Sequence, residues 1–503
     1  MHSFRPLAVS ILALVGAQVA VSCAPAPSTS ARVTTAQTAP RSVPPIPARQ
    51  PNILFVLVDD LGARDPGYAG SLLHETPNID AFAKRSVNFT AAYAASPVCT
   101  PSRAAVLTGK NPASSGITNW LPGGEYENMP LIEPPLPEHL PLEEVTLAES
   151  LKAIGYITFH SGKWHLGGPG YLPTDQGFDG NVGGGHYGQP PGGWFSPYKN
   201  AHMTDGPVGE YLEDRLTNET ISFIESASKS GKPFFAMMSY YNVHTPIHAA
   251  PGTSTEHFRR KAARLARSGA LAETVEGIGR TKLVQDNAEY ATMMSALDRN
   301  FGRLLDALER FGVSDDTIVV FTSDNGGLST LDPAHPIYST GTPTTNAPLR
   351  AGKGWAYEGG IRVPLLIAGP TTQSGSVEAP VLLTDLHATL LDLAGAQPVS
   401  GDGVTLRREL AGESGAATRT LFWHYPHYHG SGSKPASAVR RGDWKLIHHY
   451  EDNRYELFNL RSDPFENRNL ASSDSKRLSV MKAELTKALA ANQAQLPTKR
   501  TSK

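Results

Sequence analysis

The sequence predicts an α/β protein whose main sheet has buried, largely parallel strands. Residues Ile53–Val58 and Thr317–Phe321 are continuous apolar runs rich in β-branched side chains, a pattern typical of strands that are covered on both faces. Between them helical and strand patterns alternate, as in the helix expected over Thr146–Ile154 and the strand expected over Tyr156–His160. Such a chain places helices on both faces of its sheet.

Later segments continue the alternation. Pro233–Tyr240 and Val363–Ile367 are apolar runs of strand length. A long helix is expected over about Asn287–Phe311, where apolar residues recur at helical spacing. A second helix is expected over Thr384–Leu393, closed by Gly395 as its C-cap.

Length and composition set the broad class. The 503 residues exceed one ordinary domain, although large α/β enzymes can hold this length around one main sheet. A hydrophobic content of 40% is enough for a sizeable core. The formal net charge of −2 leaves no basic excess to neutralise phosphates, which argues against a nucleic-acid partner.

The first 50 residues predict export and a tether. Residues 1–23 combine Arg5 with an apolar run from Leu7 to Val21, which is shorter than the roughly 20 residues of a spanning helix and indicates a signal peptide. Ala20–Cys23 is similar to a bacterial lipobox, which would lipidate Cys23; the alternative is a secretory signal cut nearby. Residues 24–50, rich in Pro, Ala, Ser and Thr, predict a disordered tether. The expected location is the periplasm or, through the lipid anchor, the outer membrane of a bacterium.

The stretch Pro97–Arg103 contains the more informative of two cysteines, Cys99. The residues that follow, Ala104–Leu107, predict the start of a helix. A thiol near a helix N-terminus, with the guanidinium of Arg103 four residues later, is expected to have a lowered pKa. These cues alone fit a functional cysteine and a reactive but ordinary cysteine equally well.

Acidic residues follow two of the expected strands directly. Asp59 and Asp60 come after the first strand, and Asp324 and Asn325 follow the strand Thr317–Phe321. Ligands of parallel sheets bind beyond the carboxyl ends of the strands, so these side chains are expected to converge. An all-oxygen set suits a hard cation such as Ca²⁺ or Mg²⁺. The alternative for one such pair alone is a helix cap or a turn.

Cationic side chains also follow expected strands or lie in glycine-rich loops. Lys163 and His165 come after Tyr156–His160, and His244 comes after Pro233–Tyr240. Lys353 lies in a loop with glycines on both sides, which permit close backbone approach. By residue type alone, Lys163 and His165 would be an exposed lysine and a histidine with its hydrogen bonds satisfied.

Two motifs carry a family resemblance. Cys99-Thr100-Pro101-Ser102-Arg103 resembles the signature of the type I, formylglycine-dependent sulfatases. The stretch from Gly155 to Thr158, continuing to Gly162–His165, resembles the second element of the same family, in the expected order. Together with a C-terminal segment from Glu456 to Leu470, the resemblance covers about residues 51–475. Within the alkaline phosphatase superfamily, the chain resembles arylsulfatases and N-acetylgalactosamine-6-sulfatases.

The resemblance implies a cofactor, a modified residue and a set of site residues. Cys99 would be oxidised to formylglycine (3-oxoalanine), whose hydrate is the nucleophile. One Ca²⁺ ion, or less readily Mg²⁺, would be bound by Asp59, Asp60, Cys99, Asp324 and Asn325. The implied catalytic residues are Cys99, Arg103, Lys163, His165, His244 and Lys353, and the implied substrate-binding residues are Lys163, His244, Lys353 and His186.

The same resemblance assigns roles to these residues. His244 or Lys353 would protonate the leaving alcohol, and His165 would assist expulsion of the sulfate from the nucleophile. Arg103 would hold the aldehyde hydrate and its loop.

The implied fold is alkaline phosphatase-like: a large mixed, mainly parallel sheet flanked by helices, with a small C-terminal antiparallel sheet and helix. Trp444–His448 and Tyr455–Asn459 predict a hairpin in that small sheet. We expect a catalytic domain over residues 51–413 and a C-terminal subdomain over residues 414–503.

Three further features have weaker signals. Residues 257–282 are basic and predict a solvated face or a loop rather than a polyanion-binding rim. His424, His427 and His429 lack metal-ligand spacing and predict a wall of the substrate pocket. Four aromatic residues are expected to stack on sugar faces: Trp194, Trp423, Tyr425 and Tyr428.

The predicted function is hydrolysis of an organic sulfate ester, with a sulfated saccharide as the expected substrate. The alternatives are a phosphonate monoester or phosphodiester hydrolase of the same superfamily, or a non-catalytic binder of sulfated glycans. The expected partners are the sulfate ester itself, a small molecule or an oligosaccharide, and a formylglycine-generating enzyme during maturation. Contact with a membrane is expected only through a lipid on Cys23.

Overall fold

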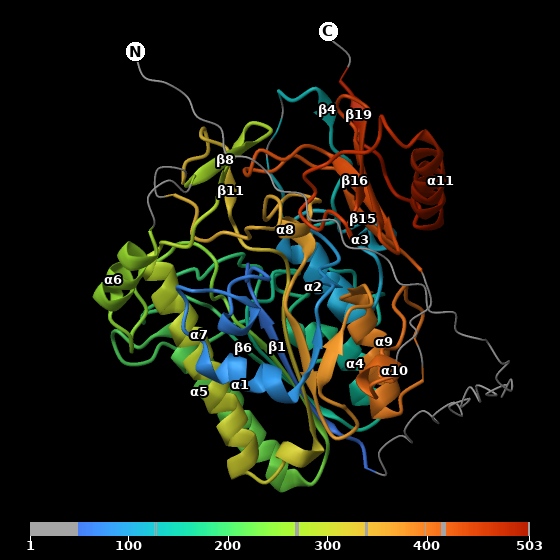
Figure 1. The fold of residues 1–503 in the computed structure, drawn as a ribbon. Coiled ribbons are helices and arrows are strands. Elements are labelled where there is room, and N and C mark those ends of the chain that lie inside the picture. Colours follow the sequence, from blue (N-terminus) through green and yellow to red (C-terminus); the bar gives the residue numbers. More distant parts are fainter. Residues whose placement is uncertain are drawn as a thin grey trace, which may run out of the picture. The chain divides into compact units, whose positions relative to one another are not determined.

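The computed structural model of the protein describes residues 49–124, 126, 128–266, 271–337, 341–397, 399–413 and 419–500. Its centre is an eight-stranded sheet with the strand order β13-β2-β12-β10-β1-β7-β5-β6 (Figure 1). The strands of this sheet are β1 (Asn52–Val58), β2 (Val87–Phe89), β5 (Ile157–Gly162), β6 (Gly180–Val182), β7 (Phe234–Ser239), β10 (Thr317–Ser323), β12 (Leu365–Ala368) and β13 (Gly375–Val377).

Strand β1 lies inside the sheet and pairs in parallel with β10 on one side and β7 on the other. The parallel arrangement continues from β7 to β5 and β6, whereas β12 runs antiparallel to its neighbours β10 and β2. Val58 pairs with Ser323, so β1 and β10 end at the same level of the sheet. The predicted mixed, mainly parallel sheet is therefore confirmed.

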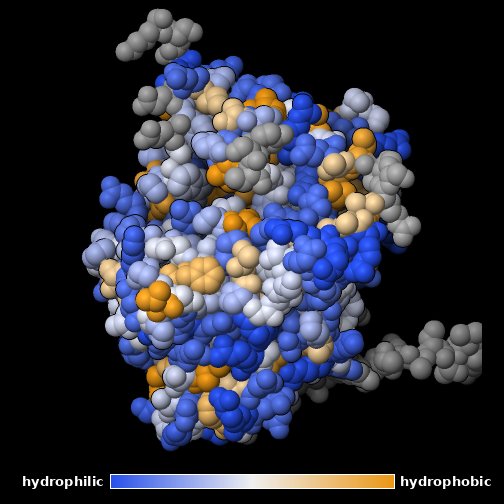
Figure 2. Space-filling view, turned by 90° about the vertical axis from the view of Figure 1, so that its left-hand side faces the viewer, coloured by the Kyte–Doolittle hydropathy of each residue, from blue (hydrophilic) through white to orange (hydrophobic). Residues whose placement is uncertain are grey.

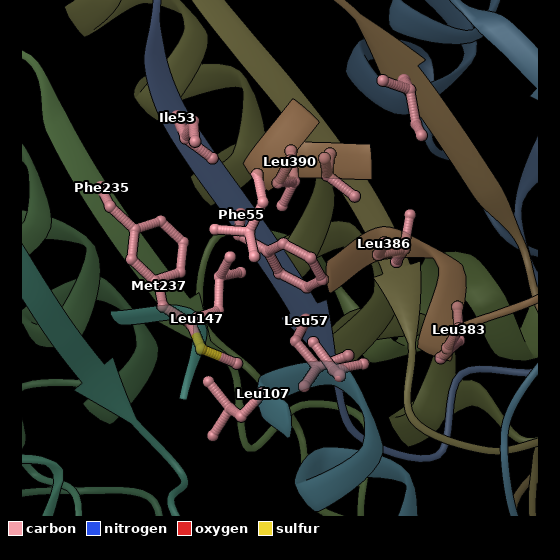
Figure 3. Packing of buried hydrophobic residues seen from close by; sticks show 14 of the residues in the cluster. Ile53, Phe55, Leu57, Leu107, Leu147, Phe235, Met237, Leu383, Leu386 and Leu390 are labelled. Carbon is pink, nitrogen blue, oxygen red and sulfur yellow. The ribbon is translucent and has the colours of Figure 1, made fainter. Parts of the chain in front are cut away.

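Each face of the sheet carries its own helices. Phe55 belongs to the buried cluster that α2, α4 and α9 cover (Figure 3), whereas Val56, the next residue of β1, belongs to the cluster covered by α1, α5 and α7. This alternation follows from the two-residue period of a strand. The six helices are α1 (Pro77–Arg85), α2 (Cys99–Thr108), α4 (Leu147–Ala153), α5 (Leu212–Ser230), α7 (Ala288–Arg310) and α9 (Thr384–Ala394).

The boundary of α4 shows how local sequence sets an element. Thr146 precedes the helix, and its hydroxyl accepts the backbone N–H of Glu149 at 3.1 Å. The Glu149 carboxylate in turn accepts the N–H of Thr146 at 2.7 Å, which completes a capping box. The helix predicted over Thr146–Ile154 is thus confirmed, with its two outer residues as caps.

Shorter elements connect these layers. The short strands are β3 (Ala92–Tyr93), β4 (Leu131–Ile132), β11 (Thr330–Leu331), β14 (Val381–Leu382) and β19 (Thr498–Lys499). The short helices are α3 (Pro112–Ser115), α8 (Glu358–Ile361) and α10 (Arg407–Leu410), with 3-10 turns at Gly67–Ala69, Pro173–Gln176 and Ser314–Asp316.

A four-stranded antiparallel sheet forms near the C-terminus, in the order β15-β16-β17-β18. The predicted hairpin is its β17–β18 pair, and helix α11 packs on one face through Met481 and Leu485. The elements are β15 (Thr420–Tyr425), β16 (Ala436–Arg441), β17 (Trp444–His449), β18 (Arg454–Asn459) and α11 (Ser475–Ala491). The predicted domain boundary at 413/414 adjoins residues 414–418, which lie outside the described residues, and it stays a prediction.

A buried ion cluster joins this small sheet to the rest of the chain. Lys445 of β17 is fully buried, and its Nζ lies 3.0 Å from Glu358 Oε1 and 2.8 Å from Glu466 Oε1. The Tyr93 hydroxyl donates to the other oxygen of Glu358 at 2.7 Å. Burial raises the pKa of Glu466, and the opposing charge of Lys445 only partly offsets this. Two buried carboxylates therefore share one ammonium.

We expect Lys445→Ala to lower the free energy of unfolding by about 3–5 kcal/mol, because it leaves buried carboxylates without their counter-charge. Urea unfolding at neutral pH measures this loss. The deficit should shrink as the pH falls towards the ordinary pKa of glutamate, since protonation removes the buried charges. Lys434→Ala is the matched control: Lys434 also pairs with a glutamate but is 46% exposed, so its loss should stay within about 1 kcal/mol. Equal losses in the two variants would contradict the proposed importance of the cluster.

The basic segment 257–282 was expected to be a solvated face or a loop, and the structure shows that it is not a loop. It contains most of helix α6 (Thr255–Leu265) and the hairpin of β8 (Glu273–Glu276) and β9 (Gly279–Lys282). Arg259 pairs with Glu289 at 2.5 Å and is 60% exposed, as a solvated face requires. The face of the molecule on the side of α6 is largely hydrophilic, with smaller hydrophobic groups between polar ones (Figure 2). Arg267 lies outside the described residues.

The predicted signal segment and nearly all of the tether, residues 1–48, lie outside the described residues. Within the described ranges, no helix combines the length and the apolar character needed to cross a membrane.

Candidate active site

The ends of β1 and β10 bring the predicted acidic residues together. Asp59 and Asp60 follow β1, and Asp324 and Asn325 follow β10, whose last residue is paired with the last residue of β1. The backbone N–H of Asp60 donates to Asp324 Oδ1 at 3.2 Å, and Asn325 Nδ2 donates to Asp60 Oδ1 at 2.7 Å. Asp60 has a φ of 59°, in the left-handed region that few non-glycine residues adopt. The convergence expected from parallel strand ends is therefore present.

Three cationic side chains meet the three carboxylates. Lys163 Nζ lies 2.7 Å from Asp59 Oδ2, and Lys353 Nζ lies 2.8 and 2.9 Å from the two oxygens of Asp60. Arg103 contacts Asp324 Oδ2 through Nε and Nη2, both at 2.8 Å. These pairs balance the buried charges of the strand ends, as burial without compensation would be costly.

The two neighbouring carboxyls nevertheless titrate in opposite directions. Burial raises the pKa of Asp59 well above its ordinary value, although Lys163 opposes the shift. Burial acts in the same direction on Asp60, but Lys353, His244 and Lys163 together hold its pKa below the ordinary range. Asp60 is therefore the more firmly ionised of the two in this arrangement.

The two sequence motifs meet at Cys99. This residue opens α2, and its Sγ lies 3.4 Å from Nδ1 of His165. The other ring nitrogen of His165 is 2.7 Å from the carbonyl oxygen of Leu121, so Nε2 carries the proton and the Nδ1 lone pair faces the sulfur. Burial, with Lys163 nearby, lowers the pKa of His165 well below its ordinary value. The neutral imidazole is thus oriented to accept a proton from a group at position 99.

Arg103 ties this pair to the charge cluster. Its Nη1 donates to the backbone carbonyl of Lys163 at 2.8 Å, while its other nitrogens hold Asp324. The guanidinium is buried, and it links α2, which begins at Cys99, to the backbone of Lys163 and to Asp324. This geometry agrees with a role in holding the loop.

His244 lies on a loop after β7 that hydrogen-bonds to β1. The N–H of Asp59 donates to the Asn242 carbonyl at 2.9 Å, and the N–H of Val243 donates back to the Asp59 carbonyl at 2.8 Å. His244 Nδ1 donates to the Thr245 carbonyl at 2.7 Å, which leaves the Nε2 lone pair 3.6 Å from Asp60 Oδ2. Burial, with Lys353 nearby, lowers the pKa of His244 well below its ordinary value.

The oxygen-rich cluster fits a divalent cation. Asp59 Oδ1 and Asn325 Oδ1 are buried, and neither has a hydrogen-bond partner within the described part of the chain. Asp59, Asp60 and His244 place one ligand atom each within 4.8 Å of one another. His244 was not among the expected ligands, because the sequence pattern gives no sign that its Nε2 would face Asp60. Asp324 lies beside these atoms but already binds Arg103.

A cavity of about 630 Å³ lies above Cys99. This volume is typical of small-molecule sites, which span about 300–1,000 Å³. Five predicted site residues line it: Cys99, His165, His186, His244 and Lys353. Asp59, Asp60, Lys163, Asp324 and Asn325 are buried and do not line it.

Sequence reasoning missed much of the cavity wall. Trp120, Tyr126, Tyr187 and His335 line it, all from irregular segments without a motif or a period. Of the histidine cluster predicted to form a wall, His429 lines the cavity. His424 instead contacts Ser437 and Gln495, and His427 contacts Thr118 and Glu133.

The four aromatic residues expected to stack on sugars do not line this cavity. Each is at most 4% exposed, which removes its ring from any bound sugar. The Trp194 ring stacks on His248, and the Trp423 indole donates to the Ala94 carbonyl. The expectation was wrong because aromatic rings of this size serve as core packing as readily as they serve as binding faces.

Comparisons with known proteins agree with this geometry. The model of the family described as Sulfatase matches residues 51–396. The chain belongs to the sulfatase family. A second family model, described as N-sulphoglucosamine sulphohydrolase, C-terminal, matches residues 351–495 of this sulfatase. The predicted class, a sulfuric ester hydrolase, is thereby confirmed.

The matches to individual relatives cover different shares of those proteins. Mouse arylsulfatase J is 32% identical over 365 residues, which cover 69% of this chain and 53% of that relative. Human arylsulfatase A is 30% identical over 501 residues, which cover 88% of this chain and 89% of that relative. The crystal structure of Ps i-CgsB is 28% identical, with a TM-score of 0.69 and coverage of 88% of this chain and 93% of that one. The predicted fold class is confirmed by this match.

Proposed function

We propose that this chain hydrolyses the sulfate ester of a saccharide, with Cys99 oxidised to formylglycine and a divalent cation bound at the ends of β1 and β10. The observation that carries the proposal is the position of Cys99 on the cavity floor, within contact of His165 and beside Lys353 and His244. The match to the sulfatase family supports it. A further crystal structure of Ps i-CgsB, 28% identical to this chain, is titled as a complex with k-i-k-neocarrahexaose, which supports a saccharide substrate.

The proposed cofactors supply one part of the chemistry. When bound, the aldehyde hydrate offers a nucleophilic oxygen that the cation polarises. We propose Asp59, Asp60, Asp324, Asn325 and residue 99 as the cation's ligands. The oxygen-rich set favours Ca²⁺, with Mg²⁺ as the alternative.

The chain's own side chains perform the remaining tasks. Nδ1 of His165 accepts the proton of a hydroxyl at position 99, since its other nitrogen is fixed by Leu121. The ammonium group of Lys353 and the ring of His244, which line the cavity, bind and orient the sulfate, which preorganises the electrostatics of the site. Lys163, predicted to contact the sulfate, is buried against Asp59 and would add positive charge to the site from outside the cavity lining. Lys353 makes a poor proton donor, because Asp60 raises its pKa against the effect of burial. His244 is therefore the proposed acid for the leaving alcohol, once the bound anion favours its protonated form.

Paired substrates test the reaction class. We expect turnover of nitrophenyl sulfate well above that of nitrophenyl phosphate and of a phenyl phosphonate ester. A preference for either phosphorus ester would favour the phosphonate or phosphodiester hydrolase that the same cysteine loop can serve. Binding of sulfated glycans without any turnover by the matured protein would indicate a non-catalytic binder.

We expect His244→Ala to slow alkyl sugar sulfates by about 10²–10⁴-fold and the activated nitrophenyl sulfate far less, because a proton donor matters most for a poor leaving group. Lys353→Ala should slow both esters by similar factors and weaken binding of inorganic sulfate. Steady-state kinetics on the two esters measures both effects, each variant serving as the other's control. Equal losses on both esters in His244→Ala would remove it as the acid, and a selective loss in Lys353→Ala would assign that role to lysine.

We further propose that the protein is exported and meets a formylglycine-generating enzyme before it folds. The support for export is the signal-like segment 1–23, with Cys23 as the proposed lipid attachment site in the periplasm or outer membrane. If globomycin blocks cleavage of the signal segment, Cys23 is lipidated. Cleavage that globomycin does not affect would indicate simple secretion.

A further inference from the structure

The cavity above Cys99 has a floor and walls of different chemistry. We call the lining side chains of Cys99, His165, His244 and Lys353 the floor, and the remaining lining side chains the walls. The floor carries the groups that handle the sulfate. Besides prolines and histidines, the walls contain the rings of Trp120, Tyr126 and Tyr187 and four aliphatic side chains: Leu121, Leu328, Leu331 and Ile337.

Charge is concentrated in the floor. Among the described residues, Lys353 is the only lining side chain with a permanent charge, and its ammonium is already held by both oxygens of Asp60. Burial lowers the pKa of the wall residue His429 to about 3, helped by Lys353, and burial also lowers the pKa of His335. Both rings are therefore neutral at neutral pH. A second anionic group that entered the walls would lose water without meeting a counter-charge, which is costly.

Two of the three aromatic rings of the walls, those of Tyr126 and Tyr187, contact neighbouring rings. Tyr126 contacts the buried ring of Tyr428, with centroids 5.8 Å apart. The Tyr187 ring has two histidine neighbours, with centroid distances of 4.3 Å to His186 and 6.5 Å to His202. Rings supported in this way lose little conformational freedom when they contact a ligand, so they provide a preorganised apolar surface.

We propose that the substrate carries its sulfate on an otherwise uncharged sugar residue and that polyanionic saccharides are poor substrates. The apolar face of that sugar residue would contact the aromatic rings of the walls. The inference rests on the proposed sulfatase function and specifies its substrate class. The floor binds one sulfate, and the walls accept the neutral body of the sugar beside it. His186 and Gln189, which lie exposed at the rim, are available for its hydroxyl groups.

Matched substrates test this inference on the matured wild-type protein. The panel is nitrophenyl sulfate, a monosulfated methyl galactoside, its disulfated analogue, and the corresponding sulfated methyl galacturonide. We expect kcat/KM to be at least about tenfold lower for the two dianionic sugars than for the monosulfated galactoside. The KM of the monosulfated sugar should change less than about twofold between about 50 and about 500 mM NaCl, because one shielded ion pair dominates its binding.

Two matched pairs of variants probe the walls directly. Gln189→Lys should raise kcat/KM for the disulfated sugar relative to the monosulfated one, and Gln189→Glu should lower this ratio further. Tyr187→Ala should raise the KM of the monosulfated sugar about tenfold, whereas Tyr187→Phe, which keeps the ring, should stay within about twofold of wild type. Circular dichroism of each variant establishes that it is folded.

The outcomes separate this inference from the proposed function. Turnover of nitrophenyl sulfate, together with equal or better turnover of the dianionic sugars, overturns the inference and leaves the sulfatase function in place. Absence of sulfate ester turnover by protein with formylglycine at position 99 overturns both. Turnover of nitrophenyl sulfate without turnover of any of the sugar sulfates overturns the assignment of a sugar.

Discussion

Cys99→Ala will lose more than about 10³-fold in the turnover of sulfate esters, because it removes the position at which the proposed nucleophile forms. The Cys99 sulfur lies on the cavity floor, 3.4 Å from the nitrogen of His165 that is free to accept a proton. Steady-state kinetics with nitrophenyl sulfate measures the loss. Cys23→Ala is the matched control, since it removes the other cysteine of the chain from the predicted signal segment. It should change membrane fractionation and leave kcat/KM unaltered.

The burial of the motif adds a condition to this experiment. Cys99 is 3% exposed and Arg103 is 1% exposed, so a modifying enzyme can reach the stretch only before the chain folds. Protein made without a formylglycine-generating enzyme should therefore stay inactive when that enzyme is added after folding. Mass spectrometry of the tryptic peptide that ends at Arg103 should show that active protein has exchanged the thiol for an aldehyde. Full activity with an unmodified thiol would contradict the proposed nucleophile.

The meeting of the acidic strand ends was predictable from the sequence because parallel strands end at a common edge. Buried apolar runs that end in Asp59 and Asp324 have few alternatives to a parallel sheet, and parallel neighbours end at the same edge. Once that edge is known, Lys163 and His244, which also follow strands, must lie near it. The motif around Cys99 then completes the set, because its helix begins beside that edge.

The walls were not predictable for the opposite reason. Trp120, Tyr126 and Tyr187 come from irregular segments, and their meeting point depends on tertiary packing that leaves no period in the sequence. Lys445 is a similar case, since a lysine in a short strand is ordinarily expected to be exposed. Its burial is explained by its ion pairs with Glu358 and Glu466, which are distant or separate from it in the sequence and meet it only in the folded chain.

The balance of charge at the strand ends differs from the simplest expectation. Asp59, Asp60 and Asp324 would repel one another if they stood alone, and a cation would then be needed to hold them together. The structure supplies a protein cation to each of them, as Lys163, Lys353 and Arg103 lie within 2.9 Å of a carboxylate oxygen. Part of this repulsion is therefore offset by side chains of the protein itself.

Removal of a divalent cation is expected to have the second large effect. Chelation should lower turnover by more than about 10²-fold, because the cation would polarise the nucleophile and screen the sulfate. Addition of Ca²⁺ to the chelated protein should raise the free energy of unfolding by about 2.7 kcal/mol at a free concentration about a hundredfold above the dissociation constant. Asp59 Oδ1 and Asn325 Oδ1, which have no hydrogen-bond partner among the described residues, are the atoms that this gain would engage. Thermal unfolding at graded Ca²⁺ and Mg²⁺ concentrations measures the gain and ranks the two ions.

Two aspartates five residues apart provide the control for this measurement. Asp60→Asn should lose most of the Ca²⁺-dependent gain, since Asp60 is a proposed ligand. Asp65 is also fully buried, but its carboxylate already accepts hydrogen bonds from the Gly62 N–H and the hydroxyls of Tyr290 and Thr344. Asp65→Asn should therefore destabilise the protein while keeping the full response to Ca²⁺. A melting curve that chelation leaves unchanged, with elemental analysis showing that the metal has been removed, would refute the proposed ligand set.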